Sequence, residues 1–159
     1  MKFKTKDGLH SFEITPQGAG LIGIFDGDAK QESSLEFTYT LSTSDDKFSK
    51  IPEGWIAQDG YMTTNPKQAG LGYMMTFAGA TMATQSNVAN VFISSGSVAG
   101  GGQALITALG GEQYDLVVAM KDGTTDTFAG YAIPVAEMLE KSQQGWLAKG
   151  WELVDSDLS

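Results

Sequence analysis

The chain has 159 residues, of which 42% are hydrophobic and 18% are charged, the size and composition of one globular domain with a substantial core. Ten lysines and no arginine stand against 19 acidic residues, so the formal net charge is −9. Tight binding to nucleic acid is disfavoured because few cations are available for phosphates. With no cysteine and one histidine, the sequence excludes a disulfide framework, a thiolate nucleophile and the usual multi-histidine metal sites.

The amino terminus has a basic start but lacks the apolar segment of a signal peptide, because Gly8, His10 and Glu13 follow it. The longest weakly polar stretch, residues 69–83, is interrupted by glycine and threonine and is shorter than the ~20 apolar residues of a membrane-spanning helix. We therefore expect a soluble intracellular chain with no membrane partner.

Short strands are expected along the first half of the chain. The clearest covers Glu32 to Thr43, where apolar and polar residues alternate with the period of a half-buried strand. Leu9 to Thr15 and Leu21 to Phe25 precede it, and Trp55 to Thr63 resumes the extended pattern. Ser42 to Pro52 between them is predicted to be a long polar hairpin loop, a kind of segment that is often functional.

The second half is expected to mix strands with two short helices. Residues 70–83 and 88–94 are predicted strands. A helix over Gln103 to Leu109 ends at Gly110-Gly111, because glycine takes a left-handed backbone at low cost. A second helix, over Val135 to Gln144, begins after Pro134 and ends at Gly145.

A hairpin and a last strand complete the predicted elements. Tyr114 to Lys121 alternates, Asp122-Gly123 supplies the turn, and Thr127 to Ile133 returns. Trp146 to Val154 is the last strand. About eight short strands without a strand–helix–strand rhythm predict a mainly β fold: one antiparallel β-sandwich or barrel over residues 1–159, with one or two short helices.

No chemical motif in the sequence has the context that it needs. Gly18 to Gly23 matches the dinucleotide fingerprint G-x-G-x-x-G, but Thr15-Pro16 and Asp26-Gly27 around it indicate strands and turns, so a glycine-rich start of a strand is favoured. The acids near Asp26 lack the flanking helices of a calcium loop. His10 has no assignable serine or cysteine partner and is expected at the surface.

The remaining candidates also favour a structural role. The carboxylate pairs Asp45-Asp46 and Glu137-Glu140 are expected to be solvated. We predict no catalytic residue, no metal site and no cofactor. The three tryptophans stay open between core, subunit interface and ligand site, because aromatic residues bury large areas in each role; they are Trp55, Trp146 and Trp151.

Three consecutive segments carry a family resemblance: Gly102 to Leu109, Tyr114 to Met120 and Asp122 to Tyr131. Their order resembles the major tail tube proteins of lambda-type long-tailed bacteriophages, in which a short helix precedes a strand, a turn of the type N/D-G-T-x-D-x-F-x-G-W/Y and a returning strand. The similarity covers Gly102 to Ile133, about a third of the chain. The predicted helix at Val135 to Gln144 departs from the family, which usually continues with strands.

The resemblance implies a subunit of hexameric rings that stack into a hollow tube in the virion tail, assembled in the host cytoplasm. Its partners are then further copies and other tail proteins, and DNA passes without specific binding. An acidic lumen would repel phosphates, and the candidate lumen residues are Asp26, Asp28, Glu32 and Glu36. The candidate inter-ring loop contains Asp45, Asp46, Lys47, Phe48 and Lys50.

Two other readings remain open from the sequence. A capsid decoration or tail-completion protein would share the composition and the lack of catalytic motifs. A ligand- or carbohydrate-binding β-sandwich would use the tryptophans.

Overall fold

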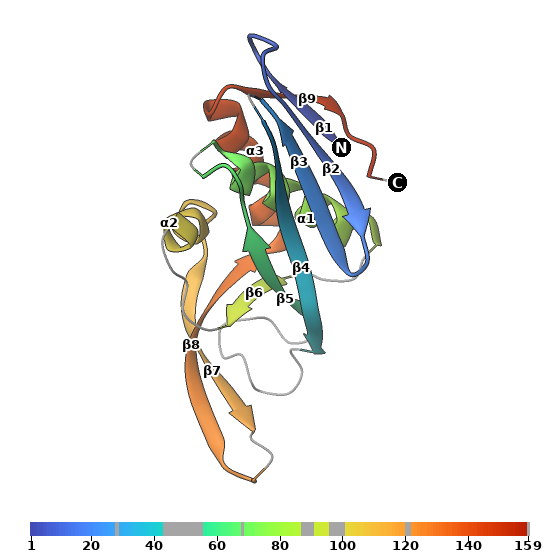
Figure 1. Ribbon diagram of the computed structural model, residues 1–159. Coiled ribbons are helices and arrows are strands. Elements are labelled where there is room, and N and C mark those ends of the chain that lie inside the picture. The colour runs from blue at the N-terminus through green and yellow to red at the C-terminus, as the bar shows by residue number, and fades with distance from the viewer. Residues whose placement is uncertain are drawn as a thin grey trace.

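The protein is mainly β, as expected, with three helices among the described residues (Figure 1). The computed structural model describes residues 1–27, 29–42, 56–67, 69–86, 91–95, 101–119 and 122–158. In chain order the elements are β1 (Lys2–Thr5), β2 (Ser11–Gln17), β3 (Gly20–Asp26), β4 (Lys30–Ser42), β5 (Ile56–Thr63), α1 (Leu71–Ser86), β6 (Val91–Ser95), α2 (Gly101–Ala108), β7 (Glu112–Ala119), β8 (Thr125–Pro134), α3 (Val135–Ala148) and β9 (Trp151–Asp155).

The strands are hydrogen-bonded in the order β7-β8-β6-β5-β4-β3-β2-β1-β9, so nine strands belong to one sheet. Neighbouring strands are antiparallel except β5 and β6, which run parallel. That exception follows from the connection, because α1 lies between these two strands in the chain and parallel neighbours need a long crossover.

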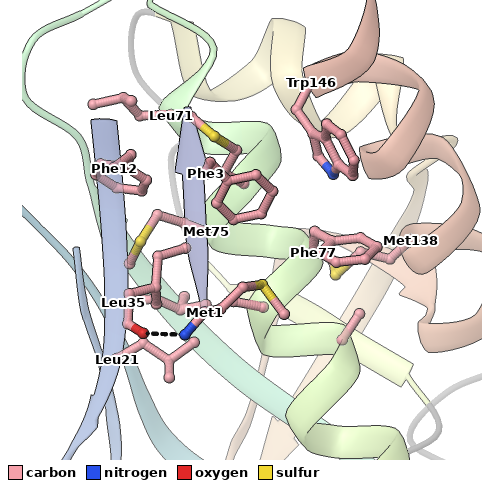
Figure 2. Close-up of a cluster of buried hydrophobic side chains, with 14 of the residues drawn as sticks. Met1, Phe3, Phe12, Leu21, Leu35, Leu71, Met75, Phe77, Met138 and Trp146 are labelled. Atoms are coloured by element: carbon pink, nitrogen blue, oxygen red, sulfur yellow. Dashed lines mark hydrogen bonds between the residues drawn. The ribbon is translucent and has the colours of Figure 1, made fainter. Parts of the chain in front are cut away.

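Helices α1 and α3 pack against each other and against one face of the sheet (Figure 1). The core lies between these layers, and Figure 2 shows its centre, where Phe3 from β1 meets Phe77 from α1 and Trp146 from α3. The ring centroids of Phe3 and Trp146 are 5.2 Å apart in an edge-to-face arrangement, the geometry that aromatic quadrupoles favour.

The predicted strand over residues 70–83 is wrong, since this segment is helix α1. The helix is buried around most of its circumference, at Leu71, Met74, Met75, Phe77, Ala78, Ala80 and Ala83. A helix enclosed in this way has no polar face and therefore no 3.6-residue period to detect. Its threonines are satisfied within the helix: the Thr76 hydroxyl donates to the Gly72 carbonyl at 2.8 Å, and Thr81 does the same to Phe77.

The predicted end of the last helix at Gly145 is also wrong. Helix α3 continues to Ala148 and includes Trp146, so the last strand begins at Trp151 and not at Trp146. The left-handed glycine that follows the helix is Gly150, at a φ of +84°. Pro134 ends β8 and stands at the helix N-cap.

The other predicted elements are confirmed within a few residues. Strand β4 starts two residues before the predicted Glu32, and α2 is followed by Gly110 at a φ of +81°. The hairpin pairs Ala119 with Thr125 across the predicted turn, where Gly123 has a φ of +86°. The Ser42 to Pro52 loop lies, after Ser42, outside the described residues.

Candidate functional site

The face of the sheet that points away from α1 and α3 carries the described acidic candidates. Along β3 and β4, the buried residues Leu21, Phe25 and Leu35 occupy alternate positions on the helix side. Asp26, Glu32 and Glu36 have the opposite parity in the register and are exposed. The structure therefore brings these three residues to one side of two adjacent strands.

The register fixes how these acids are spaced. Asp26 is paired with Lys30, Glu32 with Ile24, and Glu36 with Gly20. Glu32 and Glu36 lie four residues apart on β4 with Ser34 between them on the same face, so their positions are ~13 Å apart along the strand. Asp28 lies outside the described residues.

Further polar groups on this face come from β1 and β2. Lys2 Nζ lies 3.6 Å from Glu13 Oε2, an exposed ion pair, which contributes little to stability. Tyr61, on the neighbouring strand β5, is paired with Glu36 and is 66% exposed. In Figure 1 the described helices α1 and α3 lie on the opposite side of the sheet, so this face is left open.

The sheet ends at β7 on one side and β9 on the other, and no described strand pairs with the outer edge of either. β9 is short, and its pairing with β1 contains a register shift between Lys2 and Phe3. β7 has eight residues in unbroken register with β8 and contains neither proline nor lysine. Proline, lysine and bulges are the usual means of blocking an edge, so β7 is the more open edge.

The β7–β8 hairpin also extends beyond the sheet. β6 pairs with β8 only from Gly130 to Pro134, whereas β7 continues to pair with β8 as far as Thr125. The part from Asp115 to Ala119 and from Thr125 to Ala129 is therefore a two-stranded arm, which points away from the helices in Figure 1. A ribbon of two strands is marginally stable alone in water, and no described element packs against this arm beyond β6.

The structure does not describe the candidate inter-ring loop. Asp45, Asp46, Lys47, Phe48 and Lys50 all lie outside the described residues. Trp55 lies outside them as well.

The other two tryptophans are core residues. Trp146 is 3% exposed and Trp151 is 2% exposed. The Trp151 indole Nε1 donates to the Ala69 carbonyl at 2.9 Å, which ties the segment before α1 to β9. Neither ring is available to a ligand at the surface.

The glycine-rich fingerprint begins a strand, as favoured by the sequence. Gly18 has a φ of +57° in the turn between β2 and β3, and Gly20 to Gly23 lie within β3. A side chain at Gly20 would collide with the backbone of Leu35 on β4. The glycines therefore permit close packing, and no helix N-terminus follows them to receive a phosphate.

His10 is half-buried instead of fully exposed. Its ring lies beside that of Phe25, with centroids 5.5 Å apart, and its Nδ1 has no hydrogen-bond partner among the described residues. The Trp146 indole Nε1 is likewise buried and has no hydrogen-bond partner among the described residues. Hydrogen bonds from Thr5 and Leu9 lower the pKa of the neighbouring Asp7 carboxyl, and the charge of His10 is one of the lesser causes in the same direction.

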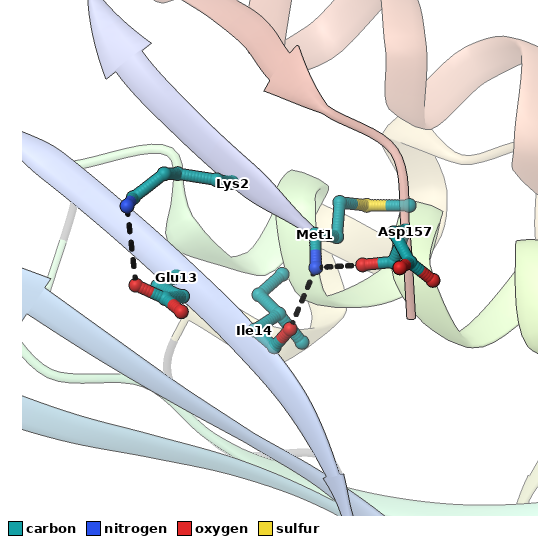
Figure 3. Close-up of polar contacts among 5 residues, drawn as sticks. All are labelled: Met1, Lys2, Glu13, Ile14 and Asp157. Atoms are coloured by element: carbon teal, nitrogen blue, oxygen red, sulfur yellow. Dashed lines mark hydrogen bonds and ion pairs between the residues drawn. The ribbon is translucent and has the colours of Figure 1, made fainter. Parts of the chain in front are cut away.

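A polar junction between the chain ends was not predicted from the sequence (Figure 3). The Met1 α-ammonium donates to the Ile14 carbonyl at 2.9 Å and to the Asp157 carbonyl. Burial lowers the pKa of this ammonium below its usual 8.0, while the charges of Asp155, Glu13 and Asp157 act in the opposite direction. The junction holds the segment after β9 beside β1.

The described residues lack the features of two kinds of site. No group of three or more histidine, cysteine, aspartate or glutamate side chains is placed to hold a metal ion. In the same ranges, no helix has the length and apolar content needed to cross a membrane.

Comparison with known proteins gives a fold resemblance. No protein-family model matches the chain, and no curated protein sequence matches it. The structure is similar to the crystal structure of an uncharacterized protein from Bacillus halodurans, with a TM-score of 0.50 and 11% sequence identity. The similarity covers 84% of this chain and 68% of that one. At this identity the likeness concerns the fold alone.

Proposed function

We propose that this protein is a non-enzymatic structural subunit of a phage virion, which forms stacked, hexameric rings of the tail tube. The resemblance of Gly102 to Ile133 to the tail tube family supports the kind of assembly that we propose, and the two open edges of the sheet support the way in which it would form. Its partners are further copies and other tail proteins, and DNA passes through the tube without specific binding.

The two edges are complementary in direction. Counting antiparallel and parallel neighbours along the sheet shows that β7 and β9 run in opposite directions. A second copy that continues the sheet would thus place its β9 antiparallel to β7 of the first, the more stable arrangement. Such a contact joins two different surfaces, so repeating it generates a ring when the rotation closes.

The open sheet face supports the lumen part of the proposal. Asp26, Glu32 and Glu36 lie together on this exposed face. In a channel, these carboxylates would repel DNA phosphates and prevent the duplex from adhering to the wall. Among the described tryptophans, Trp146 and Trp151 do not support the ligand-binding alternative, because both are buried in the core.

Electron microscopy of the purified protein over a concentration series tests the proposal, with sedimentation velocity on the same samples. We expect rings at intermediate concentration and tubes of uniform bore at high concentration. A protein that stays monomeric at all concentrations and salt conditions would overturn the proposal. Particles with no central channel would also overturn it, in favour of a decoration protein.

A further inference from the structure

The protein has two ends with different chemistry. One end carries the turn between β1 and β2, residues 6–10, and the other carries the turn of the β7–β8 arm. Figure 1 shows these turns at opposite extremes of the molecule. The arm includes residues 115–119 of β7, the edge that the ring proposal also uses, but its tip at residues 122–124 lies beyond that strand.

The β1–β2 end gathers exposed lysines, and we call it the lysine end. Lys4, Lys6, Lys30 and Lys149 are all exposed. Lys4 and Lys30 belong to one row of the sheet, because Lys4 pairs with Ser11, Ser11 with Asp26, and Asp26 with Lys30.

Backbone hydrogen bonds join the other two lysines to the same end. The Lys6 amide donates to the Gly150 carbonyl at 3.1 Å, and Lys149 is the residue before Gly150. The described acids of this end are Asp7, Asp26 and Glu152, so four lysines leave a net charge of +1 (4 − 3) in a chain of net charge −9.

Two large apolar side chains are exposed beside these lysines. Leu9, in the turn after Lys6, is 74% exposed, and Leu147, at the end of α3, is 45% exposed. The Gly150 amide donates to the Leu147 carbonyl at 3.0 Å, so the backbone contact that holds Lys6 also places Leu147 at this end. Covering these two leucines in a contact would remove apolar surface from water, which favours association.

The arm has the opposite charge. Residues 115–129 contain Asp115, Asp122 and Asp126 against Lys121, a net charge of −2 (1 − 3). Asp122 is exposed at the tip, and its Oδ1 accepts a hydrogen bond from the Thr124 amide at 3.0 Å. The bonds from Thr124 lower the pKa of the Asp122 carboxyl, so it is ionised at neutral pH.

We propose that the arm of one copy docks on the lysine end of a second copy in the adjacent ring. This inference rests on the proposed function and names the surfaces that stack the rings. Opposite ends of the molecule carry opposite net charges, so head-to-tail contact attracts, whereas contact between two like ends repels. The leucines of the lysine end would be covered by the arm, whose strands are rich in valine, leucine and phenylalanine.

A charge swap tests the contact. Lys149→Glu and Asp122→Lys each place like charges across the junction, and each is expected to raise the protein concentration needed for stacking by roughly tenfold. Single rings should still form, because neither residue belongs to β7 or β9. Combining Lys149→Glu with Asp122→Lys restores opposite charges, and the concentration for stacking should return toward that of the unchanged protein.

Two matched variants serve as controls. Lys2→Glu makes the same charge change away from both ends and should leave stacking unchanged. Asp122→Asn keeps an oxygen that accepts from Thr124 and removes the charge, so an intermediate effect is expected. Normal stacking in both single charge reversals, or a combined variant no better than either single one, would overturn this contact while rings remain. Absence of rings from the unchanged protein would instead overturn the proposed function.

Discussion

Gly145 of α3 packs directly against the aromatic ring of Tyr73 of α1. A Cβ built on Gly145 would overlap that ring, so the two helices approach closely only because this position has no side chain. The contact lies within the pair of helices that covers the sheet, and it explains a glycine inside a helix, where glycine is otherwise unfavourable.

Gly145→Ala should therefore destabilise the protein. Helix propensity alone would favour alanine by about 1 kcal/mol, but overpacking at a tight contact costs about 1–3 kcal/mol. We expect the overlap to win, with a lower free energy of unfolding in urea. Tyr73→Ala should reduce the cost of Gly145→Ala in a double-mutant cycle. Gln144→Ala, at an exposed neighbouring position, is the control; an equal cost in both backgrounds would contradict the contact.

The role of Gly145 could not be predicted from the sequence. A glycine after a helical stretch predicts a helix end when only local conformation is considered. Here its role is a contact with Tyr73, 72 positions earlier in the chain (145 − 73). Such a contact has no local pattern, and the prediction for Trp146 failed with it.

Strands and helices with one solvent-exposed face were predictable from the sequence, whereas elements buried on most sides were not. Strand β4 and the β7–β8 hairpin alternate in sequence because each has two different faces. Helix α1 is buried on most sides and was mistaken for a strand. Strand β1 was missed, because four residues are too few to establish a period.

The candidate site was predictable only in part. Alternation showed that acids on β4 share a face but could not tell which face the helices cover, and the burial of Leu35 settles this. The arm needed the register of β6 with β8, which joins segments far apart in sequence. The lysine end needed the hydrogen bond between Lys6 and Gly150.

The aromatic centre of the core should dominate stability. Phe3 is fully buried, with its ring centroid 6.3 Å from that of Phe77 and 5.2 Å from that of Trp146. Phe3→Ala should lower the free energy of unfolding by about 3–5 kcal/mol, through lost burial and the cavity left behind. Tyr61→Ala, which removes an aromatic ring that is 66% exposed, should change it by less than about 0.5 kcal/mol. Similar costs for both variants in urea denaturation would contradict this account of the core.

The Met1 ammonium should make stability depend on pH in a defined direction. Burial lowers its pKa in the folded protein below the 8.0 of the unfolded chain. The unfolded chain therefore binds more protons in the interval below pH 8.0, and stability from this group rises with pH there. It is fully present above pH 8.0 and is lost as the pH falls through the folded pKa.

Acetylation of the Met1 amino group isolates this effect. The modified protein should lose the rise in unfolding free energy below pH 8.0 and should be less stable at pH 8, because the junction with Ile14 and Asp157 is altered. Urea denaturation at several pH values measures both changes. An identical pH slope in the modified and unmodified proteins would show that another group is responsible.

Reversing charges on the open sheet face should convert a repelling surface into a binding one. Glu32→Lys with Glu36→Lys changes the face by +4 while leaving the buried side of β4 untouched. If the face lines a channel, assembled tubes of this variant should retain duplex DNA, with an affinity that falls steeply with salt. Fluorescence anisotropy with a short duplex measures the binding at several salt concentrations.

The control for this variant lies on the other side of the molecule. Glu140→Lys together with Glu137→Lys gives the same charge change on α3, away from the open face. These tubes should bind DNA more weakly than the face variant if the lumen assignment is right. Equal binding by the two variants would mean that net charge alone decides, and that the open face has no special place in the assembly.

The pairing of sheet edges can be tested cleanly because the chain has no cysteine. Leu116→Cys on β7 together with Glu152→Cys on β9 places one thiol on each edge of every copy. If β9 of one copy continues the sheet beyond β7 of another, oxidation of assembled protein should give a ladder of cross-linked species that extends beyond dimers. Non-reducing gel electrophoresis measures the ladder, and its largest strong band gives the number of subunits in the ring.

Each single-cysteine variant is the matched control, since a chain with one thiol can form only a dimer. A contact between β7 of one copy and β9 of the next can be repeated around a ring, so it gives cross-linked species larger than dimers. A contact between β7 and β7 stops at two copies. A double-cysteine protein that forms tubes yet yields only dimers would show that the sheet edges do not meet head to tail. In that case the rings would have to be closed by the arm or by the open face, and β7 would need a different partner to satisfy its edge.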